Sequence, residues 1–193
     1  MAILILGLGL VVFLGLHSIR IVADAWRGQQ VARMGLNAWK GIYSLLSLVG
    51  FALIIWGYGA ARIAPVELWS PPPWLRLPAS LLMLLSAILI AAAYVPRNRL
   101  KIALGHPMVA GVKIWAFAHL LTNGNLGDVI LFGSFLLWAI FDFRSARQRG
   151  RATGRAYPAG TLVGDAFTVA IGTAIWAVFA WYLHLLLIGV PVA

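Results

Sequence analysis

The chain has 193 residues, of which 62% are hydrophobic and only 10% charged, against about 25% charged in soluble domains. No polar stretch is long enough to bury a core of its own, which excludes a separate soluble domain. The composition therefore predicts an all-α, polytopic transmembrane helix bundle that forms a single domain over residues 1–193. The net charge of +10 lies in short loops, so we expect membrane lipid as a partner and no nucleic acid.

The first membrane span is expected over about Ala2–Val22. It is predicted to be retained, because the basic region and the small-residue cleavage site of a signal peptide are both missing. His17, Arg20 and Asp24 share one face of its last turns. A polar stripe on an apolar helix is expected to face the bundle or the lipid headgroups.

The second and third spans are predicted over about Gly41–Gly59 and Leu77–Val95. The connection between them, residues 62–76, contains three consecutive prolines that exclude a helix. The loop before the second span carries three basic residues, Arg27, Arg33 and Lys40.

The fourth span, over residues 107–121, is short and begins at a proline, which suits the first turn of a helix. His106, Lys113 and Phe117 are spaced to lie on one face of this helix. His119 lies thirteen residues after His106, roughly 140° further round at 3.6 residues per turn. The two histidines are therefore expected to face different neighbours.

The fifth span is predicted to begin with Asp128 as its N-cap and to run to about Phe141. The five arginines of residues 144–155 predict a solvated basic loop. Asp165 is the expected N-cap of a sixth span that ends near Val190.

The distribution of basic residues predicts the orientation of these spans. The first, third and fifth connections hold nearly all of the loop lysines and arginines, whereas the second and fourth hold only Arg62 and Arg76. The positive-inside rule then makes the odd-numbered loops cytoplasmic. We expect about six spans with both termini periplasmic, in a multi-pass protein of the bacterial inner membrane.

Four histidines in so apolar a chain indicate function, because ionisable groups are costly in lipid. No cysteine is present, which excludes thiolate ligands and covalently attached haem, and few carboxylates are left for zinc or di-iron. Neutral imidazoles in a helix bundle suit haem. His119 is the strongest candidate for a haem ligand. His17 is equally well explained as a ligand or as a structural hydrogen-bond donor. His106 is better explained by hydrogen bonds to loop carbonyls than as a ligand, and His184 is expected to reach the membrane interface.

Several motifs resemble the NnrU family of bacterial membrane proteins, and the resemblance covers nearly the whole chain. The most specific is Gly105-His106-Pro107 followed by Lys113-Ile114-Trp115-Ala116-Phe117-Ala118-His119. The others are Leu16-His17-Ser18 with Arg20, Trp39-Lys40-Gly41-Ile42-Tyr43-Ser44, Asn123-Gly124, Phe132-Gly133, Trp138 and Asp142. Relatives of this family include the 15-cis-zeta-carotene isomerase Z-ISO.

The resemblance implies a haem b held by axial ligands that match His17 and His119. Arg20 and Lys113 would then be the nearest cations for the haem propionates. It also implies a haem-dependent cis-trans isomerase of a zeta-carotene-like polyene, with a hydrophobic small molecule as substrate. The alternative is a non-catalytic haem or assembly protein linked to nitrite and nitric oxide reduction in denitrification. An isoprenylcysteine methyltransferase-like enzyme has little support, because Gly105 stands where that family has an arginine.

Helix geometry favours a different ligand pair. His17 lies near the end of its span, whereas His119 would lie about 18 Å into the bilayer at 1.5 Å per residue. A shared iron then requires either that the first helix extends to about Trp26 and sits deeper, or that His106 is the partner of His17. The resemblance ranks His17 with His119 first, and the geometry keeps His17 with His106 as the alternative.

Overall fold

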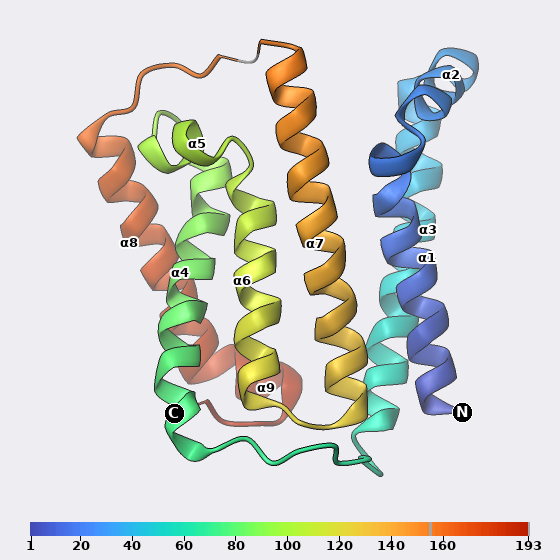
Figure 1. Cartoon of the computed structure of the whole chain (residues 1–193), viewed down its shortest axis with the longest axis vertical. Helices are drawn as coiled ribbons and strands as arrows, with labels where there is room; N and C mark the ends of the chain where they lie inside the picture. The colour runs from blue at the N-terminus through green and yellow to red at the C-terminus, as the bar shows by residue number, and fades with distance from the viewer. Residues whose placement is uncertain (155, 193) are drawn as a thin grey trace. The chain divides into compact units, whose positions relative to one another are not determined.

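The computed structural model describes residues 1–154 and 156–192, and 82% of these residues are helical. Figure 1 shows the helices. Its contacts divide the chain into two compact units, each formed by two segments. Unit 1 comprises residues 1–72 and 119–142, and unit 2 comprises residues 73–118 and 143–193. The all-α prediction is confirmed, and whether the two units behave as the single expected domain stays a prediction.

Unit 1 begins with α1 (Ala2–Val22), α2 (Asp24–Met34) and α3 (Leu36–Ala61). The predicted bounds of the first span are confirmed, but the expected basic loop after it is largely the helix α2. Gly35 separates α2 from α3 with φ of 83°, a backbone conformation that glycine adopts without steric cost.

The close packing of α1 on α3 depends on three glycines, Gly9, Gly50 and Gly57. A Cβ atom on Gly9 would lie 2.7 Å from the Ile54 nitrogen, and one on Gly57 would collide with the Leu6 backbone. A Cβ on Gly50 would lie 2.8 Å from the Phe13 nitrogen. Small residues of this kind let the backbones of membrane helices approach closely, which maximises van der Waals contact where no hydrophobic effect drives association.

Unit 1 also holds the first part of α7 (Leu126–Ala152), whose start differs from the prediction. Asp128 is not the N-cap: it lies in the first turn, buried, and its carboxylate accepts hydrogen bonds from the backbone and side-chain nitrogens of Asn125. The Tyr58 hydroxyl donates a third bond of 2.6 Å from α3. The carboxylate thus gives hydrogen-bond partners to the Asn125 nitrogens just before α7 and, through Tyr58, links α3 to α7.

Unit 2 contains the whole of α4, α5 and α8, together with parts of α6 and α7. The helices and short elements that belong to it are η1 (Pro73–Leu75), α4 (Arg76–Tyr94), α5 (Arg99–Leu104), most of α6 (Pro107–Thr122), α8 (Leu162–Val178), the π-helix η2 (Phe179–Leu183) and α9 (His184–Ile188). The predicted third, fourth and sixth spans correspond to α4, α6 and the run from α8 to α9.

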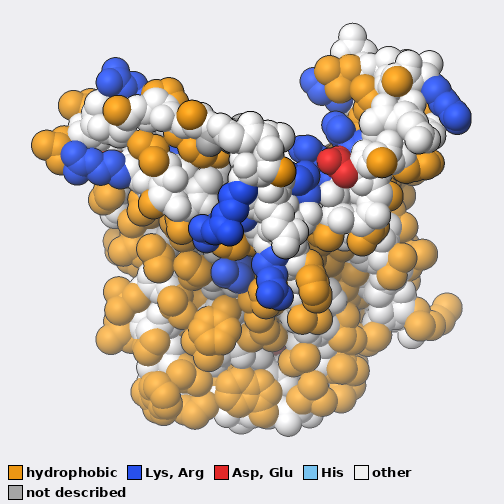
Figure 2. Space-filling view, turned by 45° about the horizontal axis from the view of Figure 1, so that its top comes forward, with side chains coloured by type: hydrophobic (Ala, Val, Ile, Leu, Met, Phe, Trp, Pro, Cys, Tyr) orange, Lys and Arg blue, Asp and Glu red, His pale blue; other side chains and the backbone are white. Residues whose placement is uncertain are grey.

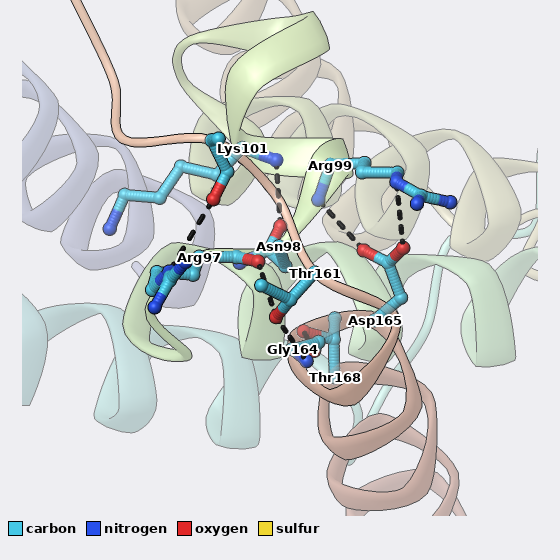
Figure 3. A network of polar contacts seen from close by, with 9 residues as sticks. Arg97, Asn98, Arg99, Lys101, Thr161, Gly164, Asp165 and Thr168 are labelled. Atoms are coloured by element: carbon cyan, nitrogen blue, oxygen red, sulfur yellow. Dashed lines mark hydrogen bonds and ion pairs between the residues drawn. The ribbon is translucent and has the colours of Figure 1, made fainter.

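A polar network joins the turn between α4 and α5 to the start of α8 (Figure 3). Thr161 is the N-cap of α8, so the prediction of Asp165 as that N-cap is wrong. Asp165 lies in the first turn and instead accepts a 2.7 Å bond from the Arg99 backbone, with the Arg99 Nε atom 3.5 Å away. The Thr161 backbone N–H donates to the Arg97 carbonyl at 2.8 Å.

The helix α7 continues through most of the predicted basic loop and ends only at Ala152. Arginine favours helices nearly as well as alanine, so a run of arginines does not by itself end one. The prediction of an irregular loop from residue 144 is therefore wrong as far as residue 152.

Five helices of the described residues are long and apolar enough to cross a membrane, by length and composition. They are α1, α3, the run from η1 to α4, α7, and the run from α8 to α9. The helix α6 has 16 residues and rises about 24 Å, less than the roughly 30 Å of a hydrocarbon core. On the face drawn in Figure 2, hydrophobic side chains cover most of the surface and Lys and Arg side chains gather in a smaller part of it. The sixth span and the orientation of the termini stay predictions.

Candidate functional site

His17 lies one turn before the end of α1, and its ring is oriented by its own helix. The Nδ1 atom is 2.7 Å from the Phe13 carbonyl, which can only accept, so Nδ1 carries the hydrogen and donates. The Nε2 atom has no hydrogen bond within the described part of the chain, and in the neutral tautomer with the hydrogen on Nδ1 its lone pair could bind a metal. Histidines that ligate metals are commonly oriented this way, with the second ring nitrogen donating to a carbonyl.

Aromatic rings surround the His17 imidazole within unit 1. Phe13 stacks on it with ring centroids 4.2 Å apart, and Tyr43 and Trp138 approach edge-on at 5.3 and 6.1 Å. The indole N–H of Trp138 is buried with no partner among the described residues. Because an unpaired buried donor is costly, this orphan next to His17 fits the presence of a further group that accepts a hydrogen bond there.

His119 lies near the end of α6 and contacts an earlier part of α7 than His17 does. Its ring stacks on Phe132 with centroids 4.4 Å apart, and its backbone carbonyl accepts a 2.8 Å bond from Asn123. Phe132 precedes Trp138 by six residues, or about 9 Å along the helix. Both candidate ligands therefore face α7 within unit 1, but at different turns.

The structure does not bring the two histidines into contact. None of the interactions of His17 in the described residues involves His119. Residues 1–154 and 156–192 contain no group of three or more His, Cys, Asp or Glu side chains able to hold a metal ion. Unit 1 therefore holds one oriented imidazole and a second histidine that contacts an earlier turn of α7, and its described residues form no preformed polydentate metal site.

An open, largely apolar groove of about 620 Å³ runs between α1 and α7 in unit 1. Trp138 belongs both to this groove and to the surroundings of His17. Gly15 on α1 lines the groove and has open space where a Cβ would stand. The groove residues are Leu10, Val11, Leu14, Gly15, Ser18, Ile21, Val22, Ser134, Trp138 and Phe141. The hydroxyl groups in this lining are those of Ser18 and Ser134, and most of the other side chains are apolar. A groove with such a lining suits an apolar ligand.

Arg20, the predicted propionate partner, forms an ion pair with Asp24 across the break between α1 and α2, at 3.3 Å. Both side chains are about half exposed, so the pair is worth ~0–1 kcal/mol. Asp24 belongs to α2 rather than to α1, and the direction in which the expected polar stripe faces stays a prediction.

The remaining candidates, His106 and Lys113, lie in unit 2. The His106 Nε2 atom is 3.0 Å from the Ala146 carbonyl of α7, so this ring donates to a helix backbone rather than to a loop. The Lys113 ammonium lies 4.8 Å from the centroid of the Phe143 ring. His184 is half-buried, and its Nδ1 atom is 2.7 Å from the Val190 carbonyl, a local contact at the end of α9.

The sequence did not reveal the partners that orient these side chains. The Phe13 carbonyl could have been found from the separation of four residues within one helix. The contact of His17 with Trp138 and the bond from Tyr58 to Asp128 join segments far apart in the chain, and no local pattern signals them.

Five helices long and apolar enough to cross a membrane, among the described residues, define a multi-pass α-helical membrane protein. The chain belongs to the NnrU protein family, whose family model matches residues 4–192 and so spans both units. Neither the curated proteins nor the solved structures contain a match to this chain.

Proposed function

We propose that this NnrU-family protein binds haem b through His17, with His119 as the second axial ligand, and isomerises a cis double bond of a polyene held in the groove of unit 1. The observation that carries the proposal is the His17 imidazole, whose Nδ1 donates to the Phe13 carbonyl and whose Nε2 is left to accept a metal. Bound haem iron would supply the chemistry that assists rotation about the double bond. We place the protein in the bacterial inner membrane.

The roles of the chain's own residues follow from the arrangement within unit 1. Phe13 holds the imidazole plane both by its carbonyl and by ring stacking. The buried indole N–H of Trp138 is available to an acceptor beside His17. The groove would align a polyene along α1 and keep water away from it, because most of its lining is aliphatic or aromatic.

An optical spectrum of the detergent-purified full chain, oxidised and dithionite-reduced, tests the ligands. His17→Ala and His119→Ala should each shift the Soret band and lower haem occupancy, because each removes an axial ligand. His184→Ala is the matched control and should leave the spectrum unchanged, since the hydrogen bond of that ring in the described residues goes to the nearby Val190 carbonyl. If His106→Ala changes the spectrum and His119→Ala does not, His106 is the second ligand. No change in any of these variants would refute haem binding by histidine.

Two glycine substitutions on α1 test the groove. Gly15→Leu fills open space inside the groove, so it should abolish conversion of a cis polyene to its trans form, followed by chromatography, while the haem spectrum persists. Gly7→Leu is the matched control, because Gly7 also has open space beside it but does not line the groove. A normal haem spectrum with no isomerisation in the unsubstituted protein would refute the catalytic proposal and favour a non-catalytic haem protein serving nitrite and nitric oxide reduction.

A further inference from the structure

A second cavity lies wholly within unit 2, between the turn that joins α5 to α6 and the last turns of α7. Its volume is about 230 Å³. Basic side chains, Arg147 and Arg151, form one wall, and the apolar end of α5, residues 102–104, forms another. His106 and Tyr157 complete the lining. None of these residues contributes to the groove of unit 1, so the cavity is a separate site.

Neither Arg147 nor Arg151 forms an ion pair with a carboxylate within residues 1–154 and 156–192. The Arg147 guanidinium lies 5.7 Å from the centroid of the Phe143 ring, and the Lys113 ammonium lies 4.8 Å from the same centroid. Like charges gathered around one ring repel each other, and a bound anion would relieve that repulsion.

Hydrogen bonds hold the walls of the cavity in place. The His106 ring donates to the Ala146 carbonyl at 3.0 Å, which ties the start of α6 to α7. The Tyr157 hydroxyl donates to the Gly105 carbonyl at 2.7 Å, so the chain after α7 is tied to the same turn. Gly150 lines the cavity without a side chain, so the backbone of α7 is open toward it. A Cβ at this position would lie 3.8 Å from the His106 ring nitrogen, an ordinary van der Waals distance.

We propose that this cavity binds the phosphate of a phosphate ester, with Arg147 and Arg151 as its charged ligands. Guanidinium groups recognise phosphate by paired, charge-assisted hydrogen bonds, and the Lys113 ammonium adds positive potential nearby. The aliphatic wall of residues 102–104 and the position of the arginines beyond the apolar part of α7 favour the headgroup of an anionic phospholipid as the source. The proposal does not rest on haem binding.

The test uses the full chain in detergent, delipidated and then given phosphatidylglycerol, phosphatidylcholine or inorganic phosphate. Native mass spectrometry counts retained lipid, and thermal unfolding reports stabilisation. Arg147→Gln and Arg151→Gln should each reduce phosphatidylglycerol retention about fivefold, the effect of one basic residue at a membrane surface. Arg144→Gln is the matched control: it removes the same charge from the same helix at a position outside the cavity.

The outcomes separate the two sources of phosphate. Preferential retention of phosphatidylglycerol that survives Arg144→Gln but not Arg147→Gln or Arg151→Gln identifies a lipid site. Stabilisation by inorganic phosphate with the same dependence on the variants, and no preference for phosphatidylglycerol, identifies a soluble phosphate ester. Arg147→Lys keeps the charge and should recover part of the binding. Equal losses in Arg144→Gln and Arg147→Gln, or no binding of either phosphate source, would overturn the proposal.

Discussion

Replacing Gly50 by alanine should force α1 and α3 apart next to the proposed haem ligand. The added Cβ would stand 2.8 Å from the Phe13 nitrogen and 3.1 Å from its Cα, whereas ordinary contact begins at 3.4 Å. The two backbones must therefore separate by about 0.6 Å at this point, the difference between 3.4 and 2.8 Å. Overpacking of this kind costs ~1–3 kcal/mol.

A second glycine in α3 isolates that packing cost. Alanine in place of glycine also stabilises a helix by roughly 0.5–1 kcal/mol, and this gain would mask part of the overpacking in Gly50→Ala. Gly41→Ala in the same helix should bring the same gain in helix stability, and the added Cβ would have no other atom within 4 Å. The difference in unfolding free energy between the two variants should therefore be ~1–3 kcal/mol.

The assay is equilibrium unfolding in mixed micelles, followed by circular dichroism, on Gly50→Ala, Gly41→Ala and the unsubstituted chain. Since the Phe13 carbonyl orients His17, haem affinity should fall in Gly50→Ala and stay unchanged in Gly41→Ala. Equal stability of the two variants would refute the close approach of α1 and α3. A stability difference without a change in haem affinity would refute only the coupling between Phe13 and His17.

Three further predictions concern helix joints and orientation. Tyr58→Phe should lower the unfolding free energy by ~1–3 kcal/mol, because it leaves a buried carboxylate of α7 without one donor, whereas Tyr94→Phe, at a 72% exposed position, should have little effect. Thr161→Ala removes the hydroxyl that caps α8 and should cost ~0.5–2 kcal/mol in the same assay; no loss would mean that the cap is dispensable. Reporter fusions after Thr153 should read as cytoplasmic and those after Ala193 as periplasmic, and both on one side would exclude six spans.

The sequence alone predicted the membrane class and most of the helices, because the length of an apolar run is a local property. The bounds of α1 are those expected, and the starts of α4 and α6 lie within one residue of their predictions. The family was also recognisable from short motifs around His17 and His106. Local spacing also predicted that Arg20 and Asp24 share a helix face, and the structure adds that they form an ion pair.

Tertiary structure decided what the polar residues do. Asp128 and Asp165 each follow a glycine and look like N-caps, yet each carboxylate is used by a partner about seventy residues away, Tyr58 for the first and Arg99 for the second. Partners so far apart in the sequence produce no local periodicity from which their contact could be predicted. The arginines from residue 144 onward predicted a loop because charged side chains need contact with solvent. They can have that contact equally well on the last turns of a long helix, and α7 continues to Ala152.

The candidate sites show the same division. Histidine content and spacing were enough to select His17 as a candidate ligand, because an ionisable group in an apolar helix is costly. The choice of His17 as the oriented imidazole depends on a carbonyl one turn away and on Trp138, which α7 brings to it. The distance between two helix backbones determines which of their side chains meet. At Gly50 the absence of a side chain permits a close approach, but this matters only once the opposing helix is in place.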